Sequence, residues 1–341
     1  MKAAVLRKIK DRLVFEEFPE PTISRDEVLV QTKAVGICGT DLHIIDGWGY
    51  TPALPHILGH EPAGIVAAVG EDVQGFKVGD RVVPNIFYAC GRCFYCRAGR
   101  ETLCSDLGGI LGVLRHNGGF AEYFKIPGRQ LFHLPDSISF EEGGVIADAV
   151  VCAVHAVLDR AEIKISELAM VVGVGGVGTS VLQVAKACGA RVVAVDLHEE
   201  KLACAREFGA EEVFLSDDRN IRQKISKLTN DLGADAVFDC VGTQQTLGLG
   251  ISCLRRGGRL VTVGYTQDRY PVDPREVTVN ELEIRGSRSG GSRNTLQAIE
   301  LVASRKVRPL LGSVMPLSEA NEALERLRSA NVVGRIVLSV S

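Results

Sequence analysis

The chain has 341 residues, a net charge of -3 and ordinary fractions of hydrophobic (46%) and charged (24%) residues. This length predicts two domains, since single hydrophobic cores stop growing near roughly 250–300 residues. The nearly balanced charge excludes the basic field of a nucleic-acid-binding protein, and no apolar stretch is long enough to span a bilayer. Because the first residues lack the apolar run of a signal peptide, we expect a cytoplasmic enzyme.

Residues 1–150 show short apolar runs separated by turn residues. Two of these runs are residues 27–32 and 64–70, and glycines follow the second run at positions 75 and 79. Short apolar runs bounded by Gly and Pro are typical of strands. We therefore expect a small, barrel-like β-rich domain in this half of the chain.

Two motifs in this half carry residue types that bind metals. Cys38 lies in Cys-Gly-Thr-Asp-Leu-His, and His60 and Glu61 lie in Gly-His-Glu-Pro. Each histidine alone is more often an ordinary surface or buried residue. Together the motifs offer a thiolate, an imidazole and a carboxylate, and a catalytic zinc takes three such protein ligands and keeps a fourth position open.

Four cysteines follow with the spacing Cys-x2-Cys-x2-Cys-x7-Cys, at positions Cys90, Cys93, Cys96 and Cys104. Four thiolates so close together can enclose one zinc ion completely, which leaves no position for a substrate and favours a structural zinc. An iron–sulfur cluster also uses four cysteines. Two disulfides are a further alternative, which an intracellular compartment disfavours.

From about residue 168 the pattern changes to continuous apolar runs, which are typical of strands buried on both faces of a parallel sheet. Helical patterns at 179–188 and 199–208 alternate with these runs, which lie at residues 168–173, 191–196, 236–240 and 259–263. The alternation predicts an α/β domain over residues 151–285, with a doubly wound parallel sheet. Residues 286–341 show two more helices and a closing strand, and we expect them to complete the first domain.

A glycine-rich motif follows the first of these strands and opens a helix, which is the context that dinucleotide binding requires. The motif is G-x-G-x-x-G, over residues 173–178. Within it, the residues that we expect to contact the cofactor are Gly173, Gly175, Gly176, Val177 and Gly178. Asp196 ends the next strand, where an acidic residue typically bonds the ribose hydroxyls of the adenosine. A carboxylate there would repel the extra phosphate of NADP, so we expect NAD.

The order of these motifs resembles that of the medium-chain zinc-dependent alcohol dehydrogenases, and the resemblance covers nearly the whole chain. It implies a GroES-like catalytic domain, made of residues 1–150 and 286–341, with a Rossmann NAD-binding domain of residues 151–285 inserted in it. It also implies two zinc ions per subunit and a homo-oligomer, for which we expect a tetramer rather than a dimer.

The resemblance further implies roles for particular residues at the catalytic zinc. Cys38 and His60 match two of its ligands, and Asp148 is our choice for the third, with Cys152 as the second choice. Glu61 matches an adjacent glutamate that acts as a nearby acid or an occasional ligand. Asp41 matches a carboxylate that orients the ligand histidine, an arrangement common around metals.

Other roles implied by the resemblance concern the proton and the cofactor. Thr40 and His43 match a relay that carries the proton of the alcohol away from the zinc. Lys201 resembles a basic residue near the adenosine ribose, and Arg335 resembles one that reaches the pyrophosphate. The segments that hold the nicotinamide amide match Val263, Ser287 and Ser289. The aromatic residues that could line the substrate pocket are Trp48, Tyr50 and Phe87.

The sequence therefore predicts a zinc-dependent, NAD-linked dehydrogenase that interconverts alcohols, secondary ones by preference, and ketones or aldehydes by hydride transfer. Within enzymes, the alternative is a polyol, diol or amino-alcohol dehydrogenase of the same superfamily, and hydroxyacyl thioester substrates also fit the pattern. Outside enzymes, the alternative is a cofactor-binding, crystallin-like relative. Retention of Cys38 and His60 favours the enzyme.

Overall fold

The computed structural model describes residues 1–330 and 332–341, which form two compact units. Unit 1 consists of Met1–Val151, Gly290–Ala303 and Leu311–Ser341, and unit 2 of Cys152–Ser289 and Ser304–Leu310. The predicted boundaries placed residues 286–289 and 304–310 in the first domain, whereas their contacts group them with unit 2. The Ser287 amide continues the sheet pairing of unit 2 by donating to Thr262 O, and the backbone of Arg308 bonds to the Gln183 side chain.

Unit 1 is rich in short strands, as its turn-interrupted apolar runs predicted. Its elements are β1 (Lys2–Leu6), β2 (Val14–Glu17), β3 (Glu27–Gly36), α1 (Gly39–Ile45), β4 (His56–Ile57), β5 (Glu61–Val69), β6 (Arg81–Pro84), α2 (Phe94–Arg97), η1 (Glu101–Leu103), β7 (Ile110–Leu111), β8 (Arg115–His116), β9 (Tyr123–Pro127), η2 (Gly128–Gln130), β10 (Leu131–His133), α3 (Phe140–Val145), η3 (Ile146–Val150), α10 (Ser292–Ala303), β17 (Leu311–Pro316), η5 (Leu317–Glu319), α11 (Ala320–Arg328) and β18 (Arg335–Ser339).

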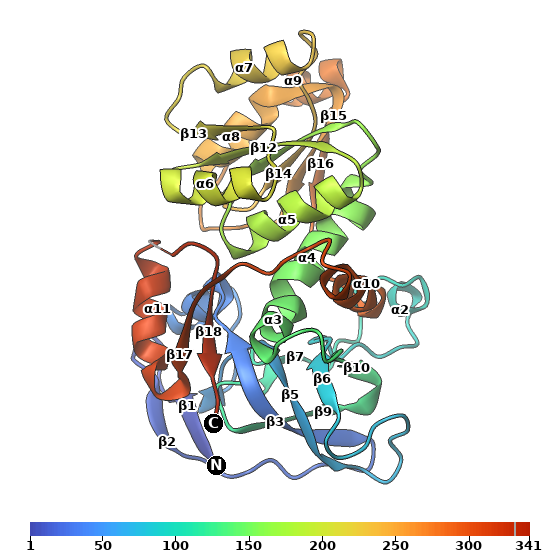
Figure 1. The fold of residues 1–341 in the computed structure, drawn as a ribbon, viewed down its shortest axis with the longest axis vertical. Coiled ribbons are helices and arrows are strands. Elements are labelled where there is room, and N and C mark those ends of the chain that lie inside the picture. The colour runs from blue at the N-terminus through green and yellow to red at the C-terminus, as the bar shows by residue number, and fades with distance from the viewer. Residues whose placement is uncertain (331) are drawn as a thin grey trace. The chain divides into compact units, whose positions relative to one another are not determined.

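The main sheet of unit 1 joins strands from both ends of the chain. Its strand order is β10-β6-β5-β3-β18-β17, and β9 also pairs with β3. Strand β18 therefore lies beside β3 in the interior of the sheet, with Val337 opposite Gly36 (Figure 1). Gly36 in turn lies opposite Glu61 at the start of β5. This register gathers three distant segments at one end of the sheet.

Unit 2 alternates strands and helices, as predicted from residue 168 onward. Its elements are α4 (Val151–Val154, whose first residue belongs to unit 1), η4 (His155–Ala161), β11 (Leu168–Val172), α5 (Gly176–Ala187), β12 (Arg191–Asp196), α6 (Glu199–Glu207), β13 (Glu212–Leu215), α7 (Ile221–Leu228), β14 (Ala234–Asp239), α8 (Gln244–Cys253), β15 (Leu254–Thr262), α9 (Pro274–Asn280) and β16 (Glu283–Gly286).

The six strands of unit 2 form one parallel sheet in the order β13-β12-β11-β14-β15-β16. The chain runs outward from β11 in one direction and then, from β14, in the other. Because parallel crossovers are right-handed, this reversal puts α5 and α6 on one face and α7 and α8 on the other (Figure 1). The predicted doubly wound sheet is confirmed, and every residue of its central strand β11 is buried, as expected between two helical layers.

Among the described residues, no helix combines the length and the apolar character needed to cross a membrane.

Candidate active site and metal centres

The first metal-binding motif is held in place by a buried carboxylate. Cys38 is the N-cap of α1, and its backbone N–H donates to Asp41 Oδ2 at 2.9 Å. The other oxygen of Asp41 accepts from the Gly59 N–H at 3.4 Å and lies 3.4 Å from Nδ1 of His60. Asp41 is fully buried and thus ties the loop of Cys38 to the loop of His60. This position agrees with the histidine-orienting role that the resemblance implied.

Four potential metal ligands converge beside these loops. The ligand atoms of Cys38, His60, Glu61 and Asp148 all lie within 4.8 Å of one another. Asp148 Oδ2 is 3.7 Å from Cys38 Sγ and 3.9 Å from His60 Nε2. A tetrahedral zinc with bonds of about 2.0–2.3 Å separates its ligands by about 3.3–3.8 Å. Cys38, His60 and Asp148 therefore already have nearly the spacing that one zinc ion requires.

The third predicted ligand comes from an irregular helix. Asp148 lies in the π-helical segment η3 and is 7% exposed, with its carboxylate in the group of four. Cys152, the second choice, is buried one helical turn later. It does not belong to this group of four possible ligands. Such π-helical turns often occur at functional sites, because the extra residue redirects a side chain.

Arg335 occupies a position that the sequence did not reveal. Its guanidinium donates to both carboxylate oxygens of Glu61, from Nε at 2.9 Å and from Nη2 at a closer distance. Nη2 also donates to Asp148 Oδ2 at 3.1 Å. Arg335 and Glu61 are both buried, so they form an ion pair in the interior of unit 1. The expected contact of Arg335 with a pyrophosphate stays a prediction.

Burial and charge both act on the titration of this group. Burial raises the pKa of Glu61 to about 7, although the guanidinium of Arg335 acts in the opposite direction. Burial alone would lower the pKa of His60, but Asp41 and Cys38 together outweigh burial and hold the pKa well above its usual value. Arg335 bonds to two buried carboxylates, those of Glu61 and Asp148, so this group carries excess negative charge that a divalent cation can balance. The donor set therefore fits a zinc ion.

Two further residues of the predicted relay lie on α1. The Thr40 hydroxyl is 3.8 Å from Cys38 Sγ. One turn later, the His43 ring packs on Trp48 with a centroid separation of 3.8 Å. Burial lowers the pKa of His43, partly offset by the carboxylates of Asp46 and Asp41. A neutral imidazole is thus available near neutral pH, as a proton acceptor requires.

The two other aromatic residues proposed for the substrate pocket belong to the hydrophobic core of unit 1. Phe87 is buried within it, and Tyr50 packs against it.

The four clustered cysteines form a second group outside the sheet. Sγ of Cys90 lies 4.0 Å from that of Cys96, and Sγ of Cys93 lies 3.9 Å from that of Cys104. Four sulfur ligands in a tetrahedron around one zinc ion lie about 3.8 Å from one another, and these distances are close to that value. They are far longer than the S–S bond of a disulfide. Backbone hydrogen bonds from Cys96 and Ser105 lower the pKa of Cys93 to about 5, which favours its thiolate form. A cluster of several irons is larger than one ion and would hold the sulfurs further apart.

The glycine-rich turn of unit 2 has the geometry that the motif requires. Gly173 has a φ of +84°, and a Cβ on Gly178 would lie 1.9 Å from the carbonyl oxygen of Gly173. A side chain at either position would therefore strain or separate the strand and the helix. A Cβ on Gly175 meets no described atom within 4 Å, so the backbone at this N-cap of α5 is open to a ligand. Gly176 and Val177 form the first turn of that helix, where N–H groups face outward.

Asp196 is anchored at the end of β12, next to this turn. Its Oδ2 accepts from the Val174 N–H at 2.8 Å, and its Oδ1 from the His198 N–H at 3.1 Å. The carboxylate is thus fixed beside the glycine-rich turn, where the ribose of a dinucleotide would lie. Lys201 lies on the first turn of α6, partly exposed, on the segment that follows.

Three residues expected near the nicotinamide lie on the same edge of the sheet. Val263 follows β15, and Ser287 and Ser289 follow β16. Both serine Oγ atoms are inaccessible to water and have no hydrogen-bond partner among the described residues. Ser289 also has a φ of +46°, which is uncommon for a residue with a side chain. Such unsatisfied and strained residues are typical of segments shaped for a ligand.

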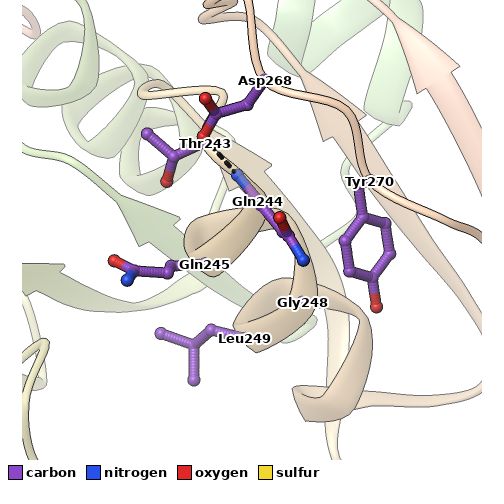
Figure 2. Close-up of a pocket in the computed structure, with 7 residues that line it drawn as sticks. All are labelled: Thr243, Gln244, Gln245, Gly248, Leu249, Asp268 and Tyr270. Atoms are coloured by element: carbon purple, nitrogen blue, oxygen red, sulfur yellow. Dashed lines mark hydrogen bonds between the residues drawn. The ribbon is translucent and has the colours of Figure 1, made fainter.

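A cavity of about 630 Å³ in unit 2 was not predicted, because no motif marks it. It opens between the N-terminal end of α8 and the loop after β15 (Figure 2). The Gln244 N–H at this helix end donates to Asp268 Oδ2 at 3.1 Å, and the Thr246 N–H donates to Thr243. Two of the N–H groups at this helix end are therefore already bonded, and we assign no ligand to the cavity, whose lining residues are Thr243, Gln244, Gln245, Gly248, Leu249, Asp268 and Tyr270.

Comparison with known proteins agrees with this geometry. The alcohol dehydrogenase GroES-like domain family matches residues 24–136, and the zinc-binding dehydrogenase family matches residues 176–304. An alcohol dehydrogenase from Geobacillus stearothermophilus is 36% identical over the full length of both chains. A sorbitol dehydrogenase from Bacillus subtilis is 35% identical and covers 96% of this chain and 93% of its own. The crystal structure of an NAD-dependent alcohol dehydrogenase superposes with a TM-score of 0.94 at 32% identity, over the whole of both chains.

Full-length identity of this degree, two matching families and the same fold confirm the resemblance that the motifs first indicated. The chain belongs to the medium-chain zinc-dependent alcohol dehydrogenase family, with a GroES-like domain and a Rossmann-type domain, and it is an oxidoreductase.

Proposed function

We propose that this protein is a zinc-dependent, NAD-linked alcohol dehydrogenase that oxidises secondary alcohols to ketones and catalyses the reverse reduction. The observation that carries the proposal is the convergence of Cys38, His60 and Asp148 at zinc-ligand spacing, from three separate elements. When bound there, zinc acts as a Lewis acid that makes the hydroxyl group of an alcohol more acidic. The four cysteines hold a second zinc that has no open position and supports the fold.

We infer from the charges of the site that Glu61 stays outside the zinc shell. A zinc ion with the Cys38 thiolate, the Asp148 carboxylate and a neutral His60 sums to zero charge. Glu61 and Arg335 form a neutral pair of their own, with two hydrogen bonds between them. Coordination by Glu61 would break that pair and make the shell negative, which weakens a Lewis acid. Glu61 can therefore serve at most as a transient ligand while the substrate position is vacant.

Thr40 and His43 are proposed for the first and last steps by which the proton of the alcohol leaves the site, with the ribose hydroxyls of the cofactor between them. We assign the first step to the Thr40 hydroxyl, which lies beside Cys38 Sγ and can pass a proton on. We assign the last step to the His43 imidazole, whose pKa is lowered by burial so that it is neutral and ready to accept. Packing on Trp48 holds the ring of His43 in one orientation.

The cofactor is proposed to bind unit 2 at the glycine-rich turn. The open backbone at Gly175 and the start of α5 would receive the pyrophosphate, and the anchored Asp196 would accept from the ribose hydroxyls. The negative charge of Asp196 disfavours NADP, and one similar structure is that of an NAD-dependent enzyme. Lys201 near the ribose, Arg335 at the pyrophosphate, and Val263, Ser287 and Ser289 at the nicotinamide complete this proposal.

A polyol dehydrogenase is the second candidate. Its support is the sorbitol dehydrogenase relative, which is nearly as similar to this chain as the alcohol dehydrogenase relative is. A crystallin-like binding protein has less support, because such a role does not need the complete ligand group around Cys38.

We also propose a cytoplasmic homotetramer. Strand β16 ends the sheet of unit 2 among the described residues, and its Ile284 is 44% exposed, which suits pairing with a second copy.

Metal analysis and a substrate panel test the proposal together. We expect two zinc ions per chain, turnover of secondary alcohols with NAD, and far weaker turnover with NADP. Cys38→Ala should leave one zinc per chain and abolish turnover. One zinc per chain in the unaltered protein would overturn the proposal of two zinc sites. Equal use of both cofactors would overturn the preference for NAD. A clear preference for polyols over simple secondary alcohols would overturn the proposed substrate class.

A further inference from the structure

The four-cysteine lobe, which we define as residues 90–104, is bonded to the N-terminus of helix α10 through Glu101. Glu101 opens the short turn η1 that leads to Cys104, and the Cys104 N–H donates to the Glu101 carbonyl at 3.0 Å. The Glu101 carboxylate accepts from the backbone N–H of Ser292 at 2.5 Å. A Cβ on Gly291 would lie 2.8 Å from the same oxygen, so glycine at 291 permits this approach.

The chain just before the lobe also forms hydrogen bonds near the N-terminus of α10. Asn85 lies five residues ahead of Cys90, and its Nδ2 donates to Gly290 O and to Thr295 Oγ1, both at 3.0 Å. Gly290 is where the chain returns from unit 2 to unit 1, so we call residues 290–295 the re-entry segment. The re-entry segment is therefore bonded both to Glu101 of the lobe and to Asn85, in the chain just before the lobe.

The bond from Glu101 suits the physics of a helix end. The first N–H groups of a helix lack partners within it, and the helix dipole makes that end partly positive. A carboxylate from elsewhere in the chain satisfies both needs at once. Because Glu101 lies on a turn held by the Cys104 loop, metal binding at the cysteines limits how far its carboxylate can move.

The re-entry segment lies next to residues that matter for the proposed reaction. A Cβ on Gly290 would lie 2.7 Å from the Val151 side chain, and Val151 follows the π-helical segment that carries Asp148. On its other side the segment continues directly into Ser289 and Ser287. Fixing residues 290–295 therefore restricts the segment proposed to hold the nicotinamide.

We propose that Glu101 is a positioning residue that couples the four-cysteine metal to the order of the re-entry segment and so to NAD binding. The part of this inference that concerns NAD rests on the proposed function. The coupling between the lobe and the segment does not, because it concerns bonds within unit 1.

The test compares hydrogen–deuterium exchange across residues 287–296 with NADH affinity, measured by fluorescence, in the metal-loaded protein. Loss of a helix cap speeds local exchange about fivefold, so Glu101→Ala should show this change together with a several-fold rise in the Kd for NADH. Glu101→Gln keeps an acceptor oxygen and should restore most of both. Asp106→Ala is the matched control, because Asp106 pairs with the exposed Arg92 at the surface next to the lobe, and it should change neither.

Unchanged exchange in Glu101→Ala, an equal change in Asp106→Ala, or no rescue by glutamine would overturn the coupling. Should Glu101→Ala fail to fold, Glu101→Asp provides the same test, because its shorter side chain weakens the bond to Ser292. If the unaltered protein binds no NADH, the proposed function fails, while the exchange comparison still decides whether Glu101 orders the segment.

Discussion

Replacing Arg335 with methionine tests how strongly the buried ion pair stabilises unit 1. Glu61 is fully buried and Arg335 is 6% exposed, so solvent screens their attraction little. Arg335 makes two hydrogen bonds to Glu61 and one to Asp148, all charge-assisted. Removing one member of a buried pair costs about 3–5 kcal/mol, mainly because the remaining charge is left without a partner. We expect Arg335→Met to lower the free energy of unfolding by about 4 kcal/mol.

A double-mutant cycle separates the pair from general damage. Glu61→Gln combined with Arg335→Met removes both charges, and we expect the coupling between the two sites to be about 3 kcal/mol. The single tryptophan of the chain, Trp48, lies in unit 1, so its fluorescence during denaturation reports on this unit. Measurements need saturating zinc, because metal binding itself contributes to stability. A coupling energy below about 1 kcal/mol would show that the pair is not a stabilising interaction.

Three further predictions concern the cofactor, the proton and acid stability. Asp196→Ala should raise turnover with NADP relative to NAD by at least about tenfold, since one carboxylate no longer repels the phosphate, and an unchanged cofactor ratio in steady-state kinetics would contradict this. His43→Gln should slow turnover mildly and remove the inflection on the acidic side of its pH profile, whereas an unaltered profile would exclude the relay. Burial lowers the pKa of His56 to about 4. Since the unfolded histidine binds its proton near pH 6.5, stability should fall by about 3 kcal/mol between pH 6.5 and 4, and His56→Gln should lessen that loss in denaturation measured across the same range.

Local patterns in the sequence predicted most of unit 2, because each parallel strand is a continuous apolar run. Strand β12 has the predicted bounds of 191–196. Helix α5 begins at Gly176 rather than at 179, since the glycines of the motif themselves form its first turn. Strand β3 runs to Gly36 rather than ending at 32, because pairing with β5 and β18 continues along it. Such pairing depends on partners that a local pattern does not contain.

The candidate sites likewise include some that a local sequence pattern predicted and some that depend on distant residues. The four cysteines lie within fifteen consecutive residues, and their spacing alone indicated a metal. By contrast, Glu61 and Arg335 are 274 positions apart, and nothing near either residue in the sequence shows that they form a pair. The bond from Glu101 to Ser292 spans 191 positions and was likewise not predicted. Resemblance located Asp148, but only the fold shows that its oxygen faces both Cys38 and His60.

The interior position of β18 determines when the site can form during synthesis. Arg335 and its strand emerge from the ribosome after every other part of the main sheet of unit 1, yet β18 lies between β3 and β17. Unit 2 can fold while that place is still empty, and the cysteines at 90–104 can capture a metal from a local segment alone. The mononuclear site instead gains the counter-charge for Glu61 only after the last strand inserts. We therefore expect the four-cysteine site to bind its proposed metal before the site at Cys38 and His60 does.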